Sequence, residues 1–240
     1  MEDIFLRNRM LLGDAAVDCL REKRVAVFGV GGVGSYAAEA VVRAGVGNIT
    51  LVDSDCVSPT NINRQLIALH STAGMPKAEA MKSRALDINP SASVNALVGR
   101  YTGADRDAFF AERYDYIIDA IDTVSSKLDL IETSVSLGIP IISALGTGNK
   151  LDPSRLRISD ISKTSGCPLA RVVRKELRRR GIFTLEVIFS NEEAVVPLPL
   201  EAPPPGRRSV PASVPWVPSC AGLMMAGRVV TRLISEAAGR

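Results

Sequence analysis

The chain has a single histidine and no paired cysteine motif. Its one histidine, His70, is expected to be structural, which argues against hydride transfer, a reaction that usually uses a histidine as general acid or base. The cysteines are scattered and form no Cys-x-x-Cys pair, so we expect no zinc-finger-like site and a reducing compartment. They are Cys19, Cys56, Cys167 and Cys220.

Long apolar runs are also absent. No unbroken apolar run reaches membrane-spanning length, and the N-terminal "MEDIFLRNRM" does not resemble a signal peptide, so we expect a cytoplasmic protein without membrane contact. With 240 residues, 46% of them hydrophobic, the chain can build one sizeable α/β domain. We expect a single domain over 1–240, with a nucleotide-binding core in 1–150 and a substrate-binding extension in 151–240.

A glycine-rich turn stands out in "VAVFGVGGVGSYAAEAVVRAG". A β-branched run from Arg24 to Val30 leads through glycines into an alanine-rich helix that stops at Gly45. Such a turn places free backbone N–H groups and a helix N-terminus at one point, which binds phosphate. A lone fingerprint of this kind is weak evidence. The glycines are Gly29, Gly31, Gly32 and Gly34.

The next predicted strand, "NITLVDSD", ends at Asp53, where an acid that binds ribose hydroxyls is expected. An aspartate that serves only solubility is the alternative. The residues beyond it fit a nicotinamide dinucleotide poorly. Arg64 and Lys77 follow within one crossover, and two cations beside a helix N-terminus suit a triphosphate whose charge is neutralised while a phosphorus bond breaks.

A further predicted strand, in "YDYIIDAIDT", contains Asp119 and ends at Asp122. Parallel sheets bind ligands at the carboxyl ends of their strands, and Mg²⁺ takes one or two carboxylates together with phosphate oxygens. We therefore favour Asp122 as the Mg²⁺ ligand. Asp119 lies inside the strand, where a buried structural acid is the alternative.

Together, "GVGGVG", "LVDSDCVSPTNINRQ", "GMPKAEAM" and "DAIDT" resemble the adenylating domain of the ubiquitin-activating-enzyme-like superfamily, which includes ThiF and MoeB. The resemblance implies an ATP- and Mg²⁺-dependent enzyme that converts a carboxylate to an acyl-adenylate. It implies that Asp53 holds the ribose, that Asn61, Arg64 and Lys77 hold the phosphates, and that Asp122 holds the magnesium. The implied nucleotide-binding residues are Gly29, Gly31, Gly32, Gly34, Asp53, Asp55, Asn61, Arg64, Gln65, Lys77 and Asp122.

The resemblance gives catalytic roles to Arg64, Lys77, Asp122 and Arg7. In the superfamily an N-terminal arginine completes the ATP site, often from the partner subunit, so Arg7 in "FLRNRMLLG" implies a homodimer. A loose basic N-terminus is an equally good interpretation of Arg7.

The C-terminal part resembles the tRNA threonylcarbamoyladenosine dehydratase family, through "LDPSRLRISDISKT", "PLARVVRKELRRRG" and "VPSCAGLMMAGRVV". That resemblance implies ATP-dependent activation of the carboxylate of threonylcarbamoyladenosine in tRNA, followed by ring closure with net loss of water. Two departures stand out. Cys167 occupies a position where the family often has Asp, and Ile67 one where many members have His.

Positive charge is concentrated in "RVVRKELRRR" (171–180), although the whole chain carries only +3. We expect a helix with an apolar stripe of Val172, Val173 and Leu177. A solvated helix face is the default interpretation, but this concentration favours a polyanion partner. The predicted tRNA-binding residues are Lys163, Arg171, Arg174, Lys175, Arg178 and Arg179.

The predicted architecture is a Rossmann-like, doubly wound, mostly parallel α/β sheet with strands near 24–30, 48–53, 93–99, 115–121 and 139–145. Strands near 155–160 and 184–190 are expected to extend this sheet in the antiparallel direction. A closing helix over 219–237 is expected to carry Leu223, Ala226, Val230 and Leu233 on one face, which packs either in the core or against a second subunit. The proline-rich segment 197–218 is either a loop over the site or a linker. Cys220 is either a small buried residue or a reactive thiol.

Other functions stay open at this stage. The chain can instead be an adenylating activator of the C-terminus of a ubiquitin-like or sulfur-carrier protein, or have a sulfur-transfer or carrier protein as a partner. A nicotinamide oxidoreductase is the more remote alternative. The zinc-bearing sulfur-carrier activators share two Cys-x-x-Cys pairs that this sequence lacks.

Overall fold

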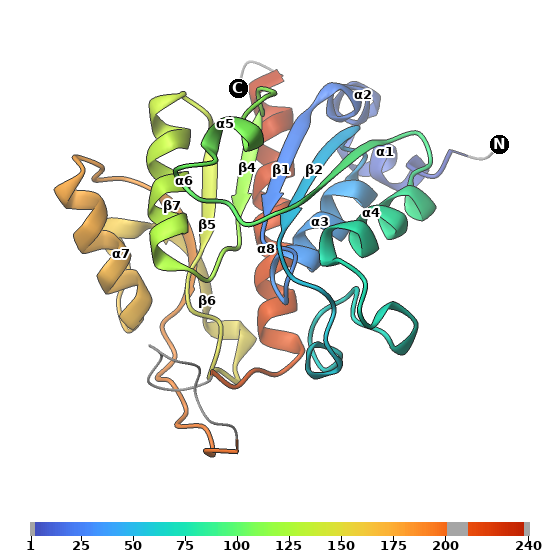
Figure 1. Ribbon diagram of the computed structural model, residues 1–240. Coiled ribbons are helices and arrows are strands. Elements are labelled where there is room, and N and C mark those ends of the chain that lie inside the picture. Colours follow the sequence, from blue (N-terminus) through green and yellow to red (C-terminus); the bar gives the residue numbers. More distant parts are fainter. Residues whose placement is uncertain (1–2, 201–210, 238–240) are drawn as a thin grey trace.

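The computed structural model describes residues 3–200 and 211–237. Its centre is a seven-stranded sheet with the order β3-β2-β1-β4-β5-β7-β6 (Figure 1). The β1, β4 and β5 strands are short apolar runs, and nearly all of their residues are buried. The strands are β1 (Arg24–Phe28), β2 (Asn48–Asp53), β3 (Ser93–Val98), β4 (Tyr116–Asp119), β5 (Ile141–Ala144), β6 (Leu156–Asp160) and β7 (Glu186–Ser190).

All seven strands lie where the sequence predicts them. The two late strands pair antiparallel with each other, with Ile158 opposite Ile188. However, β7 itself runs parallel to β5, so only β6 opposes the rest of the sheet. In the sheet β7 lies between β5 and β6, so it pairs parallel with one neighbour and antiparallel with the other.

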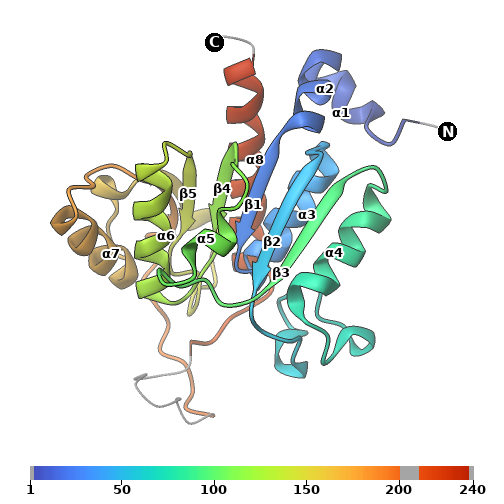
Figure 2. The same cartoon turned by 45° about the horizontal axis from the view of Figure 1, so that its top comes forward.

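Helices cover both faces of the sheet (Figures 1 and 2). One core cluster joins α2, α3, α4 and α8 to one face, and a second joins α5, α6 and α7 to the other. The helices are α1 (Leu6–Leu12), α2 (Asp14–Glu22), α3 (Gly34–Ala44), α4 (Lys77–Ile88), α5 (Arg106–Phe109), α6 (Val124–Ser136), α7 (Pro168–Arg179) and α8 (Trp216–Ala237). Short 3-10 turns occupy Pro59–Asn61, His70–Thr72, Pro153–Arg155 and Ile161–Lys163.

The direction of winding reverses between β1 and β4. The β1–β2–β3 half carries α3 and α4 on one face, and the β4–β5 half carries α6 on the other. Ligands of open α/β sheets bind in the crevice that such a reversal leaves at the carboxyl ends of the strands. The turns that follow β1 and β4 are therefore where a site is expected.

The closing helix α8 begins at Trp216, earlier than expected, and packs along α3. At the crossing, a Cβ on Gly222 would lie 2.3 Å from Val33 O, so only glycine allows this approach. Ala226, Val230 and Leu233 are buried in the core, one of the two expected environments, whereas Leu223 is 49% exposed and does not join them there. The contact between α8 and α3 is centred on Gly222, so the adjacent Leu223 faces outward.

We expected no segment that could span a membrane. Among the described residues, the stretch Trp216–Ser235 of α8 is nevertheless long and apolar enough by length and composition. Half of it is buried inside the fold, and Arg228 and Arg232 interrupt it. Core helices of this length pass the same test.

Candidate active site

A cavity of about 750 Å³ lies at the reversal point between β1 and β4. Residues from the turns after β1, β2, β4 and β5 line it, together with the segment that leads into α8. Its lining contains Gly29, Gly31, Gly32, Asp53, Asp55, Asn61, Arg64, Gln65, Lys77 and Asp122. The structure thus brings nearly all of the predicted nucleotide-binding residues to one place.

Two of the loop glycines are required by the backbone, because a side chain there would clash with it. Gly29 has φ +88, and a Cβ on it would lie 2.7 Å from Ala120 O. A Cβ on Gly34, the first residue of α3, would lie 1.7 Å from Gly29 O. These two glycines therefore let β1 turn sharply into α3 beside the end of β4.

The other two glycines leave room for a ligand. A Cβ on Gly31 would meet nothing nearer than Gln65 Nε2 at 3.7 Å, and one on Gly32 nothing nearer than Pro218 Cβ at 3.4 Å. The α3 N-terminus has no side-chain cap. Uncapped N–H groups at a helix N-terminus attract anions, and bare glycines let a phosphate approach them closely.

Asp53 is fixed by the backbone on both of its carboxylate oxygens. Its Oδ2 accepts from Val30 N at 2.7 Å and its Oδ1 from Asp55 N at 2.9 Å. Burial raises the pKa of Asp53 above its ordinary value, against the effect of these hydrogen bonds. The carboxylate stands beside the glycine loop, where a ribose hydroxyl would donate to it.

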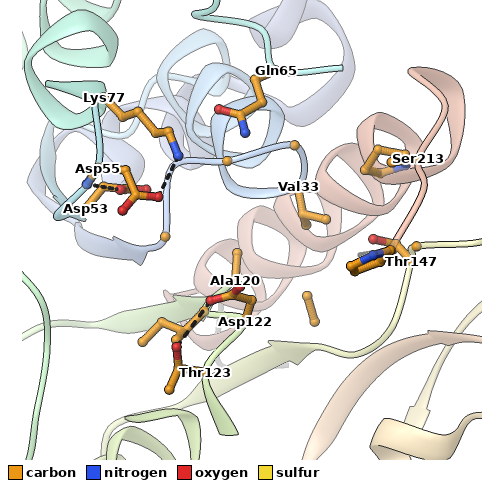
Figure 3. A pocket seen from close by; sticks show the side chains of 18 of the residues that line it. Val33, Asp53, Asp55, Gln65, Lys77, Ala120, Asp122, Thr123, Thr147 and Ser213 are labelled. Carbon is orange, nitrogen blue, oxygen red and sulfur yellow. Dashed lines mark hydrogen bonds and ion pairs between the residues drawn. The ribbon is translucent and has the colours of Figure 1, made fainter. Parts of the chain in front are cut away.

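Lys77 opens α4, and its side chain is almost fully buried. Its Nζ donates to Asp55 Oδ2 at 2.8 Å, and this hydrogen bond lowers the pKa of the Asp55 carboxyl. Figure 3 shows Asp53, Asp55 and Lys77 together on one side of the cavity. A buried ammonium directed at the loop is placed to bind phosphate oxygens.

Arg64 and Gln65 lie side by side on the loop that follows β2. Arg64 Nη1 donates to Thr60 O at 3.0 Å and to Asn63 Oδ1 at 2.9 Å, which holds its guanidinium at the cavity. Gln65 is only 7% exposed, and its Oε1 has no hydrogen-bond partner. An orphaned buried amide in a ligand cavity indicates a polar ligand, because leaving it unpaired costs free energy.

One polar atom of the Asn61 side chain is already hydrogen-bonded within its own turn. Its Oδ1 accepts from Ser58 N at 3.1 Å, which caps the short helix Pro59–Asn61. The side chain still lines the cavity. Its amide N–H groups are the part of Asn61 that can donate to a phosphate.

Asp119 is the structural acid, as the alternative interpretation held. It is fully buried, and its Oδ2 accepts from Lys127 Nζ at 2.6 Å and from Ser143 Oγ. Its Oδ1 accepts from Ile121 N at 3.0 Å, so the buried pair anchors the turn that carries Asp122.

Asp122 is exposed at the carboxyl end of β4 and lines the cavity (Figure 3). Within the described residues, no group of three or more His, Cys, Asp or Glu side chains could hold a metal ion. A single carboxylate facing a phosphate site nevertheless fits Mg²⁺, which completes its shell with phosphate oxygens and water.

Several cavity residues carry no signal in the sequence. Arg100, just beyond β3, donates from Nη2 to Thr123 Oγ1 at 3.3 Å at the cavity. Thr147 follows β5. Pro211, Ala212 and Ser213, which we call the 211–213 wall, also line the cavity, and Ser213 lies across it from Lys77 (Figure 3). Chain folding alone brings these segments to the glycine loop.

Arg7 does not line this cavity. It is exposed on α1, and the neighbouring Asn8 Nδ2 donates to Arg43 O at 2.7 Å, near the C-terminal end of α3. The cavity lies at the opposite end of α3, about 16 Å away along its axis. Within one chain Arg7 therefore cannot reach this cavity, and its predicted role requires a second copy.

The predicted basic helix is α7, and one end of it meets the cavity at Leu169. Val173 and Leu177 are buried, but Val172 is 47% exposed, so the apolar stripe is narrower than predicted. Arg174 Nη1 donates to Ile161 O and to Thr164 O at 2.9 Å. This guanidinium holds the preceding turn, unlike the other basic residues of the helix. Those that point outward are Arg171, Lys175, Arg178 and Arg179, which we call the basic face of α7.

The four cysteines are free thiols. Cys167 is the N-cap of α7, with its Sγ accepting from Ala170 N at 3.4 Å, which explains why an aspartate also suits this position. Ile67 is buried in the core. Cys220 lies in the second turn of α8 and is half-buried.

Known proteins resemble this chain over almost its whole length. A family model described as "ThiF family" matches residues 5–238. The tRNA threonylcarbamoyladenosine dehydratase of Bacillus subtilis (strain 168) is 46% identical over 241 residues, which cover 97% of this chain and 95% of that protein. The molybdopterin-synthase adenylyltransferase of Escherichia coli (strain K12) is 32% identical over 126 residues, 52% of this chain and 50% of that protein.

Solved structures resemble this chain as well. The crystal structure of the E. coli tRNA N6-threonylcarbamoyladenosine dehydratase TcdA in complex with ATP superposes with a TM-score of 0.88 at 32% identity, covering 98% of this chain and 96% of that one. The same E. coli enzyme in complex with AMP gives a TM-score of 0.88.

Proposed function

This chain belongs to the ThiF family, and on that premise we propose that it catalyses the ATP-dependent dehydration of threonylcarbamoyladenosine in tRNA. The observation that carries the proposal is the cavity at the β1–β4 reversal. Its bare glycines, ribose-binding acid and buried cation form an ATP site, and the match to dehydratases extends through the C-terminal extension as well.

The chemistry follows from the arrangement of the site. A carboxylate oxygen of the substrate attacks the α-phosphorus of ATP, the bond between the α- and β-phosphates breaks, and pyrophosphate leaves. A nucleophile in the same side chain then attacks the acyl carbon and gives up its proton, and AMP leaves. Water is lost overall, and ring closure needs proximity more than a covalent relay.

Each group of the cavity has a part in these steps. The glycine loop and the α3 N-terminus hold the phosphates, and Arg64 and Lys77 neutralise charge that develops on the leaving pyrophosphate. Asp53 orients the ribose. We propose Asp122 as the carboxylate that would hold Mg²⁺, which supplies further neutralisation of phosphate charge when bound.

The decisive test is to incubate the protein with ATP and tRNA that carries threonylcarbamoyladenosine, and to analyse the nucleosides by mass spectrometry. We expect the nucleoside to lose one water while AMP and pyrophosphate are released. ATP analogues sharpen the test, because a β,γ-methylene analogue should support turnover and an α,β-methylene analogue should not. Release of ADP and phosphate would contradict adenylation.

We also propose that the basic face of α7 binds the tRNA backbone. Its four cations follow one side of the helix for about 12 Å, and the first of them, Arg171, comes two residues after Leu169, which lines the cavity. A line of cations that leads away from the nucleotide suits a substrate whose modified base enters the cavity while its backbone stays outside. Lys163 is exposed just before α7 and can extend this line.

Charge reversal tests this interface. We expect Lys175→Glu with Arg178→Glu to weaken tRNA binding and to reduce the magnitude of the log–log salt slope by about 2. Arg21→Glu with Arg113→Glu, on exposed residues elsewhere, is the charge-matched control. Arg174 is unsuitable for this test, because its loss would also release the Ile161–Thr164 turn. If tRNA affinity depended on salt in the same way for both double variants, the basic face of α7 would be only a solvated surface.

We propose a homodimer in which Arg7 completes the partner's site. The α1 helix buries none of its own residues, and Leu6, Met10 and Leu11 are exposed on it beside Arg7. An apolar surface of this kind favours a second copy. Co-expression of Arg7→Ala with Asp122→Ala subunits should restore about a quarter of wild-type activity, because half of the dimers then contain one intact site. A role for Arg7 within its own subunit predicts no recovery.

The activator of a carrier-protein C-terminus is the alternative function. The match to an adenylyltransferase supports it over only half of the chain. ATP–pyrophosphate exchange that depends on a protein ending in Gly-Gly, and not on tRNA, would favour it. A sulfur-transfer or carrier-protein partner stays a prediction that co-purification tests. We place the reaction in the cytoplasm, where free thiols such as the exposed Cys56 persist.

A further inference from the structure

The 211–213 wall has no regular secondary structure, yet it forms one side of the cavity. Ser213 and Thr147 lie across the cavity from Asp53 and Lys77 (Figure 3). Because the phosphate-binding groups occupy the far side, this wall borders the space left for the second substrate. Its position depends on contacts from elsewhere in the chain.

One of these contacts comes from Asn149, just beyond the β5 turn. Asn149 N donates to Ala212 O at 2.8 Å, and Ala212 N donates to Asn149 Oδ1 at 2.7 Å. Val195 N also donates to Asn149 O, at 2.9 Å. Asn149 has φ +59, the one positive φ outside glycine in residues 3–200 and 211–237, and asparagine tolerates this conformation best after glycine.

The other contact comes from the phosphate side of the cavity. Asn63 Nδ2 donates to Ser213 O at 3.0 Å, across 150 positions of sequence. The same amide accepts from Arg64 Nη1 through Oδ1 at 2.9 Å. One side chain therefore joins the guanidinium that binds phosphate to the wall on the opposite side.

We propose that Asn63 is a positioning residue that links Arg64 to the 211–213 wall, so that a nucleotide bound at Arg64 fixes the wall against which the second substrate binds. The amide is suited to this because one end accepts from the arginine while the other donates to the wall. Arg64 and Ser213 both line the cavity, and the exposed Asn63 joins them. A phosphate that orders the Arg64 guanidinium also orders its partner. This inference rests on the proposed ATP site.

Trp216 offers a direct reporter. It is the one tryptophan in the chain, it lies three residues beyond Ser213, and its Nε1 donates to Leu151 O at 2.6 Å. Movement or ordering of the wall should change its emission. The response needs no RNA, so it can be measured with ATP·Mg²⁺ alone.

The experiment titrates the full chain with ATP·Mg²⁺, following Trp216 emission while calorimetry measures nucleotide affinity. We expect an emission change in the wild type that Asn63→Ala loses at matched saturation. Asn63→Asp keeps an acceptor for Arg64 but has no donor for Ser213 O, so it should also lose the response. Each variant should raise KM for the tRNA about 5-fold, as expected for one lost hydrogen bond, and leave kcat nearly unchanged.

Two variants serve as controls. Asn149→Gly keeps the positive φ but removes the bond to Ala212 N, so it should raise KM for tRNA without changing ATP affinity. Asn191→Ala breaks an asparagine–arginine bond of the same kind, Arg155 Nε to Asn191 Oδ1 at 3.1 Å, away from the wall, and should respond as wild type does.

The outcomes separate the two proposals. A wild type that binds ATP, together with an Asn63→Ala variant that gives the full Trp216 response, overturns this inference and leaves the ATP site intact. A wild type that does not bind ATP in the calorimeter overturns the proposed function, and this inference with it.

Discussion

The buried pair beneath the site gives the sharpest prediction about stability. Asp119 and Lys127 are both fully buried, 2.6 Å apart, and Ser143 hydrogen-bonds to both of them. Asp119→Asn preserves the shape and an acceptor for Ile121 N but removes the negative charge. The Lys127 ammonium then stays buried without a counter-ion.

The size of the effect follows from that burial. Breaking a buried pair by removing one partner costs about 3 to 5 kcal/mol, whereas a surface pair contributes about 1 kcal/mol or less. We therefore expect Asp119→Asn to lower the free energy of unfolding by about 3 to 5 kcal/mol. The loss should be insensitive to salt, because ions screen buried charges poorly.

Urea unfolding at two salt concentrations measures this. The double variant Asp119→Leu with Lys127→Met removes both charges, and we expect it to be more stable than Asp119→Asn alone, since apolar replacement of a buried pair is often neutral. A cost below about 1 kcal/mol for Asp119→Asn would refute the claim that the pair holds this part of the sheet.

Three further predictions concern the chemistry. Asp122→Ala should abolish AMP release at every Mg²⁺ concentration while the fold stays intact, and full activity at high Mg²⁺ would remove Asp122 from the metal site. Burial raises the pKa of Asp53, so this carboxyl becomes protonated at a higher pH than an ordinary aspartate does. On acidification, the ATP affinity measured by calorimetry should therefore start to fall at that higher pH, and Asp53→Asn should not show this fall. Cys220→Ser should keep most activity, because ring closure is intramolecular; a loss of several orders of magnitude with an intact fold would make the thiol the nucleophile.

The sequence predicts the fold and the clustering of the residues that we propose to bind phosphate for the same physical reason. Apolar runs that end in glycine or aspartate define buried parallel strands and the ligand positions at their carboxyl ends. Gly29 to Gly34, Asp53 and Asp122 are all set by their distance from a strand end, a local property. They could therefore be placed before any tertiary contact was known.

Tertiary contacts decided what the sequence could not show. Arg174 belongs to the same basic run as Arg178, but only packing reveals that it holds the Ile161–Thr164 turn. Leu223 continues the helical period of the α8 stripe, yet the close approach at Gly222 turns it outward. Periodicity describes which side chains share a face, and the neighbouring helix decides which face is buried.

The two sides of the cavity therefore carry different kinds of information. The side that we propose to bind phosphate is built from local turns that recur wherever a strand feeds a helix, and in this proposal it holds the nucleotide and neutralises its charge. The opposite side is built from Thr147 and the 211–213 wall, which long-range hydrogen bonds through Asn63 and Asn149 hold in place. A change of acceptor substrate can be accommodated there without disturbing the glycine loop. Selectivity between an RNA carboxylate and a protein C-terminus should accordingly respond to substitutions in the wall and its asparagines, and the rate of adenylation to substitutions at Arg64, Lys77 and Asp122.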